Sequence, residues 1–335
     1  MSFSSPPNDP SPNSPTPIRP LSVGNVVSAA FRLYRANFQQ YLGIAWQATL
    51  WVIVPLLLLL VPAVYIFSLA NNRASAAQGL GLFSIVVTVW VATYIYCLSY
   101  YLAHAAAITR LAYSELLGQP EDPKAVQRIT QSRRWSFWGS TFLLGLLIGG
   151  ISIVSAIVFF IAIGVVAGSS GAIRFTASGR PIVDDPAVAL AVGGLFLLGL
   201  LLWLTWLTWM SARFFLPEVT IAVEDNVGAA ASLSRSWNLT KRNAWRIVGV
   251  LLVAFLVTLP IQILLQIISE VANKLIAVSF PVNSPSYAVI TFIASMILSF
   301  GISMVILPYW QAIKAVVYYD LRSRREGLGL NLRDR

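Results

Sequence analysis

The chain has 335 residues, of which 57% are hydrophobic and only 11% are charged. Soluble domains are roughly 25% charged, so too few charges remain to cover a water-soluble surface of this size. The net charge of +10 comes from short basic clusters beside apolar runs and not from a nucleic-acid motif. This pattern excludes nucleic acid and favours anionic phospholipid headgroups as partners.

The N-terminal segment differs in composition from the rest of the chain. Residues 1–20 hold seven prolines and five serines and have no basic start followed by an apolar stretch, so they do not resemble a signal peptide. We interpret residues 1–20 as a disordered cytoplasmic tail. Cys97 is the single cysteine, which excludes an internal disulfide and a two-cysteine metal site.

Six apolar stretches follow the tail, and about 20 apolar residues suffice to cross a bilayer. We predict membrane spans at about 41–68, 82–104, 137–166, 187–215, 244–268 and 287–313. The helical pattern of the second span continues past Arg110 to Leu117. The segments 21–38, 119–134 and 226–243 are basic, and their amphipathic pattern favours helices in the headgroup layer. The predicted fold class is therefore an all-α integral membrane protein of about six transmembrane helices.

The distribution of basic residues predicts the orientation. Of the 23 lysines and arginines, 19 fall on one side of the predicted spans. The other four are Arg73, Arg174, Arg180 and Lys274. Because basic residues are retained on the cytoplasmic side, we expect both termini in the cytoplasm.

An internal repeat of about one hundred residues organises these segments. Residues 31–44 align without gaps on residues 237–250. At a constant offset of 103, Arg110, Glu115, Glu121 and Asp122 align with Arg213, Glu218, Glu224 and Asp225. We predict three parallel hairpins, each preceded by a basic interfacial amphipathic helix. The units would be about 21–118, 119–225 and 226–318 of a membrane domain at 21–318, with a basic cytoplasmic tail at 319–335.

Three stretches carry a family resemblance: AASLSRSWNLTKRNAWR at 230–246, RFFLPE at 213–218 and PYWQAIKAVVYYDLRSRREG at 308–327. They are similar to the bacterial glycerophosphoryl diester phosphodiesterase membrane-domain family and related multi-pass proteins of unknown function. The resemblance implies a bacterial cytoplasmic membrane location, with an internal membrane such as the thylakoid as the alternative. No segment outside the membrane is long enough for a phosphodiesterase barrel, so the activity in the family name does not carry over.

Polar residues near the cytoplasmic boundary form the candidate sites. We predict that Arg110 with Glu115, and Arg213 with Glu218, make ion pairs or polar contacts that dock each basic helix, and that Asp320 and Arg322 close the third unit. Glu270 and Lys274, four residues apart, are expected to pair. The candidate anionic-lipid contacts are Arg32, Arg35, Arg133, Arg134, Lys241 and Arg242. The alternative is that these cations only enforce topology.

Catalytic chemistry finds little support in the sequence. Gly168–Gly171 fits a Gly-x-Ser-Gly pattern, but His104, the sole histidine, is expected at the opposite side of the bilayer, about 30 Å away. We therefore expect no enzyme, no cofactor and no metal. The favoured function is a noncatalytic membrane module that organises lipids or docks a protein partner or a second copy. The alternative is a transporter or channel for a lipid or small amphiphile, in which Gln262 and Gln266 line a cavity.

Overall fold

A computed structural model describes residues 22–58, 76–170, 174–175, 181–182, 186–282 and 284–326. The predicted tail at 1–20 lies outside the described residues. The elements are α1 (Val23–Ala36), α2 (Phe38–Leu58), α4 (Ala76–Leu116), α5 (Pro123–Ser132), α6 (Arg134–Ser169), β1 (Arg174–Phe175), β2 (Pro181–Ile182), α7 (Pro186–Arg213), α8 (Pro217–Val223), α9 (Ala229–Thr240), α10 (Ala244–Ser279) and α11 (Pro285–Glu326).

Within the described residues, six helices are long and apolar enough to cross a membrane. They are α2, α4, α6, α7, α10 and α11, in agreement with the six stretches predicted from the sequence. Most side chains in their apolar centres are exposed in the isolated chain, such as Val154, Leu201 and Leu264. Exposed apolar surface of this extent is typical of helices that face lipid or a partner helix. The pattern is that of a multi-pass membrane protein.

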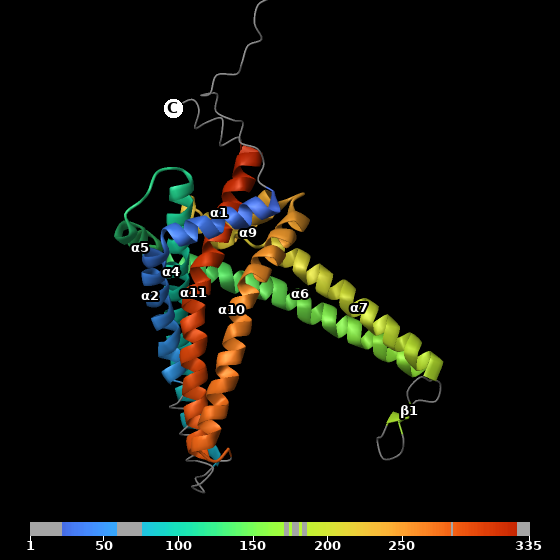
Figure 1. Ribbon diagram of the computed structural model, residues 1–335. Helices are drawn as coiled ribbons and strands as arrows, with labels where there is room; N and C mark the ends of the chain where they lie inside the picture. The colour runs from blue at the N-terminus through green and yellow to red at the C-terminus, as the bar shows by residue number, and fades with distance from the viewer. Residues whose placement is uncertain are drawn as a thin grey trace, which may run out of the picture.

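The long helices form two groups. Helices α2, α4, α10 and α11 lie side by side, whereas α6 and α7 pair with each other and lean away from the other four (Figure 1). The short strands β1 and β2 pair antiparallel in the connection between α6 and α7, with Arg174 opposite Ile182. At the other end, α6 contacts α4, α8 and α9. The two groups therefore join at one end of the molecule.

We call this joined end the cap, and define it as α1, α5, α8 and α9 with the end of α4 from Ala103 and the end of α11 from Pro308. Helix α1 lies across α10 and α11 (Figure 1). The main apolar core lies here and includes Val26, Ile108, Leu216, Leu239 and Leu321, all at most 2% exposed. Because α4 and α11 have 41 and 42 residues, each is about 60 Å long and extends well beyond a 30 Å hydrocarbon layer.

Local sequence signals determine where two short helices of the cap begin. Ser22 accepts a hydrogen bond from the amide of Asn25 at 3.2 Å and begins α1. Asp122 does the same for Ala125 at 3.1 Å, with Pro123 as the first residue of α5. Such caps satisfy amides that the first helical turn leaves unpaired. They explain why the two helices begin at Val23 and Pro123, two and four residues after the start of the predicted segments.

The C-terminal boundary corrects one prediction. Residues 319–326 were expected to belong to a basic tail, yet α11 continues to Glu326. Asp320 and Leu321 are both buried in the cap. Their burial follows from the apolar side of this last stretch, which packs into the main core. Residues 327–335 lie outside the described part of the chain.

Candidate functional site at the cap

Charged side chains tie the helices of the cap together. Arg235 of α9 contacts Glu224, at the end of α8, at 2.9 Å and also pairs with Glu326 of α11. Tyr318 donates to the same Glu224 carboxylate at 2.6 Å. Burial works against the charge of Arg235, but hydrogen bonds to Glu224 and Glu326 prevail and raise the pKa of its guanidinium. This arginine therefore stays charged and joins three elements.

The predicted pairing of Arg110 with Glu115 is wrong. Five residues along a helix turn the side chain by about 140°, so the two residues leave α4 on different sides. Arg110 instead contacts Glu121 at 2.8 Å and donates to the carbonyl of Ala222 at 3.1 Å. Glu115 accepts from Asn37 at 2.6 Å and from Tyr41 at 3.2 Å. Both residues still dock neighbouring helices, but through other partners.

Arg213 and Glu218 also take different partners. Helix α7 ends at Arg213 and α8 begins at Pro217, so helical spacing does not relate the two side chains. Glu218 forms an ion pair with Lys314 of α11. Arg213 is only 4% exposed, and its guanidinium lies 3.7 Å from the centroid of the Trp237 ring. A desolvated cation over an indole is stabilised by the ring quadrupole.

Asp320 and Arg322, predicted to close the third unit, make separate contacts. Asp320 is 3% exposed and accepts from Arg246 of α10 at 2.6 Å and from Arg324 at 2.9 Å. Arg322 contacts Glu326 at 2.8 Å. At the other end of α10, Glu270 and Lys274 lie 3.6 Å apart, as predicted.

The candidate lipid contacts divide into two kinds. Arg32, Arg35, Lys241 and Arg242 are exposed. Arg133, however, donates to the carbonyls of Ile221 at 3.1 Å and Glu224 at 2.8 Å, and to Asp225 at 2.9 Å. The unpaired carbonyls at the end of α8 draw this side chain inward, so we withdraw Arg133 from the lipid contacts.

Arg134 makes a different set of contacts. Its Nη1 donates to the hydroxyl of Tyr100 at 3.0 Å, and its guanidinium lies 4.6 Å from the centroid of that ring. Trp51 of α2 stacks on the same tyrosine, with ring centroids 4.3 Å apart. Sequence reasoning missed Trp51 and Tyr100, because residues so distant in the chain meet only through the packing of α2 on α4.

His104, Ser169 and Ser170 bond within their own helices, and Gly171 lies outside the described residues. His104 is 4% exposed, and its Nδ1 lies 2.7 Å from the carbonyl of Tyr100. Ser169 and Ser170 donate to carbonyls of their own helix. Among the described residues no group of three or more His, Cys, Asp or Glu side chains could hold a metal ion.

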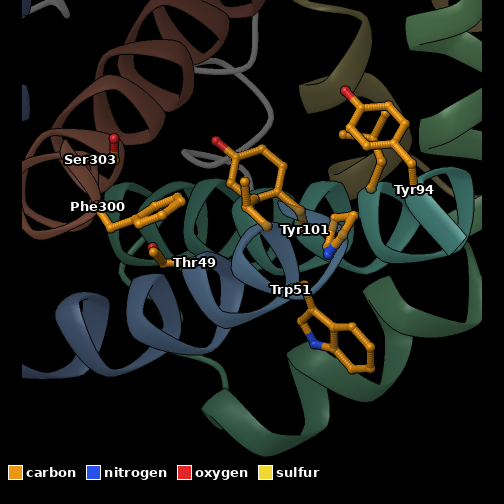
Figure 2. A pocket seen from close by; sticks show the side chains of 9 residues that line it. Thr49, Trp51, Tyr94, Tyr101, Phe300 and Ser303 are labelled. Carbon is orange, nitrogen blue, oxygen red and sulfur yellow. The ribbon is translucent and has the colours of Figure 1, made fainter. Parts of the chain in front are cut away.

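Two hollows border Trp51. The first, of about 280 Å³, lies between α2, α4 and α11 and is lined by Thr49, Trp51, Tyr94, Tyr101, Phe300, Ser303 and three apolar neighbours (Figure 2). Its hydroxyls on Thr49 and Ser303 bond carbonyls of their own helices. The second, of about 470 Å³, lies nearer the cap and is described below. Gln262 and Gln266, expected to line a cavity, line neither hollow and are exposed on α10.

By fold, the protein belongs to the class of multi-pass membrane proteins, with a polar cap at one end of six apolar helices. Residues 126–321 match a family described as a domain of unknown function (DUF7847). This match covers more than half of the chain, so the protein belongs to that family. No curated protein and no solved structure matches the chain. The resemblance to the glycerophosphoryl diester phosphodiesterase membrane-domain family stays a prediction.

Proposed function

We propose that this protein is a noncatalytic membrane module whose cap faces the cytoplasm and gathers anionic phospholipids at the inner leaflet. One observation carries the proposal. Most carboxylates of the cap form ion pairs within the cap, whereas many of its cations are exposed. A surface with this imbalance attracts anionic headgroups. The module binds lipid and does not act on it, since the polar side chains of the cap mainly hold its own helices together.

Six exposed cations lie on three separate segments: Arg32 and Arg35 on α1, Lys124 and Arg128 on α5, and Lys241 and Arg242 after α9. Arg324 and Arg325 at the end of α11 are exposed as well, but they bond Asp320 and backbone carbonyls of the cap. None of the six forms an ion pair with a carboxylate in the described part of the chain. By contrast, Glu121, Glu218, Glu224, Asp320 and Glu326 all pair with arginine or lysine. The positive charge of the cap is therefore available to lipid.

Exposed tryptophans support the placement of these cations in the headgroup layer. Trp135 and Trp245 are the second residues of α6 and α10 and are 51% and 62% exposed, and Trp46 lies in the third turn of α2 at 51%. Indoles favour the membrane–water interface. On this reading, α1, α5 and α9 lie just outside the tryptophans, in the headgroup layer.

The threefold repeat is part of the proposal. Each of α2, α6 and α10 follows a shorter helix, α1, α5 or α9, after a break of one to three residues. Trp135 and Trp245 are both the second residue of their helices. We read the units as parallel hairpins, each preceded by a basic interfacial helix, and as relatives of the glycerophosphoryl diester phosphodiesterase membrane domains.

The competing function is transport of a lipid or small amphiphile. The hollow lined by Thr49, Tyr101 and Ser303 favours it, because its volume of about 280 Å³ is near the lower bound of small-molecule sites, roughly 300 Å³. Transport requires flux through reconstituted vesicles, and lipid gathering does not. Docking of a protein partner or a second copy on the same cap would require a stable complex in detergent.

Spin-labelled lipids in reconstituted vesicles test the proposal. The protein should prefer phosphatidylglycerol over phosphatidylcholine, and the neutral double variant Lys241→Gln, Arg242→Gln should weaken that preference, since each surface cation contributes about 1 kcal/mol. The charge-preserving variant Lys241→Arg, Arg242→Lys is the matched control and should retain it. Equal preference in all three proteins would refute the proposal.

A further inference from the structure

The second hollow next to Trp51 is a groove with a polar end and an apolar end. Its lining residues are Gln47, Leu50, Trp51, Val54, Tyr100, His104 and Gln131, around a volume of about 470 Å³. Helix α2 runs from the cap inward, so Gln47 lies at the cap side and Val54 about 10 Å deeper. Helix α4 runs the opposite way, which brings His104 to the cap side as well. Polar groups therefore line the outer end and apolar groups the inner end.

The polar end offers hydrogen-bond donors. The His104 Nδ1 faces a backbone carbonyl, which only accepts, so this nitrogen carries the proton and Nε2 accepts from the Gln131 amide at 3.5 Å. The second N–H of Gln131 and the amide of Gln47 remain for a ligand. No carboxylate lines the groove.

Arg134 supplies positive charge at this end. It does not line the groove itself but contacts Tyr100, which does. Tyr100 is the acceptor for one of its five N–H donors, and no carboxylate among the described residues lies within 4 Å of it. Its Nε is buried without a hydrogen-bond partner in the described part of the chain. The guanidinium keeps its positive charge beside the groove without a neutralising carboxylate among the residues described, and this charge favours an anion at the polar end.

We propose that this groove binds one glycerophospholipid with an anionic headgroup, with its phosphate against Gln131 and Gln47, in the field of Arg134 beside Tyr100, and an acyl chain along Leu50, Trp51 and Val54. The charge of Arg134 selects an anion, and the apolar lower wall selects a molecule that carries a chain. The inference rests on the proposed function and deepens it, because it assigns one stoichiometric site beside the diffuse attraction of the exposed clusters.

Native mass spectrometry of the full chain in detergent tests the site, with phosphatidylglycerol and phosphatidylcholine of identical acyl chains as probes. The first phosphatidylglycerol molecule that binds should bind more tightly than any further one and more tightly than phosphatidylcholine. Arg134→Gln should weaken it about fivefold, the effect of one surface charge. Arg134→Lys keeps the charge and should lose less phosphatidylglycerol affinity than Arg134→Gln. Arg128→Gln removes an exposed cation of the neighbouring helix outside the groove and is the matched control.

Three results would overturn the site. These are equal binding of both lipids to the wild-type protein, an equal loss in Arg128→Gln and Arg134→Gln, or displacement of the lipid by millimolar glycerol phosphate as effective as by phosphatidylglycerol. The last result would assign the site to a soluble phosphate compound.

A second variant tests the groove if Arg134→Gln unfolds. Leu50→Trp fills the apolar end at an exposed position and must weaken phosphatidylglycerol binding. Unchanged binding of phosphatidylglycerol rejects the groove. Should the Lys241, Arg242 double variant lose lipid preference while these groove variants do not, the groove fails and the lipid-gathering module stands.

Discussion

Arg246, in the first turn of α10, donates a hydrogen bond of 2.6 Å to the buried carboxylate of Asp320, near the end of α11. The contact joins α10 to α11 at their cap ends. Arg324 reaches the same carboxylate at 2.9 Å. Asp320 therefore links the last turns of α11 to α10 and stabilises them in the cap.

Asp320→Ala is expected to destabilise the protein strongly. Removal of one partner of a buried ion pair typically costs about 3–5 kcal/mol, and because Arg246 and Arg324 keep some contact with solvent we expect about 2 kcal/mol. The thermal midpoint of the purified protein in detergent measures the effect. Glu270→Ala is the control, since its pair with Lys274 is well exposed and contributes little. Equal thermal midpoints for both variants would contradict the stabilising role of the Asp320 ion pairs.

Arg213 and Trp237 are expected to be energetically coupled. A desolvated cation over an indole contributes about 1–2 kcal/mol, so the losses in Arg213→Met and Trp237→Leu should be non-additive by about this amount in a double-mutant cycle. Unfolding in detergent, followed by circular dichroism, gives the four free energies. Additive losses would mean that the two side chains are merely adjacent.

The sequence predicts the helices better than their contacts. Apolar length alone indicates six spans, and the helical pattern ends at Leu117 where α4 ends at Leu116. Partner choice was not predictable, because Glu115 meets Asn37 and Tyr41, 78 and 74 residues away, only after α2 packs on α4. The same holds for Arg133, whose acceptors on α8 exist only once that short helix has formed. A count of charges also misses the burial of Asp320, which depends on where α11 lies.

Gly199 is predicted to favour the close packing of α6 on α7. A Cβ at this position would lie 2.1 Å from Cε2 of Phe159, so Gly199→Ala must displace the ring, at a cost of about 1–3 kcal/mol. Gly193→Ala, with nothing within 4 Å of its Cβ, should leave the thermal midpoint unchanged or raise it, because alanine favours helix.

A second substitution makes the Gly199 prediction sharper. Phe159→Leu shortens the obstructing side chain, so the Gly199→Ala, Phe159→Leu double variant should recover part of the midpoint lost by Gly199→Ala alone. If the double variant loses the sum of both single effects, the steric explanation is wrong and α6 and α7 pack differently.

The orientation of the cap is the central claim, because lipid gathering at the inner leaflet fails without it. The most direct measurement is thiol labelling in intact cells with a membrane-impermeant maleimide, in a Cys97→Ser background that carries either Lys241→Cys in the cap or Lys274→Cys near the far end of α10. Both lysines are exposed, so access to the reagent depends on the side of the membrane. We predict that Lys274→Cys is labelled in intact cells and that Lys241→Cys is labelled only after permeabilisation. Labelling of Lys241→Cys in intact cells would contradict the account.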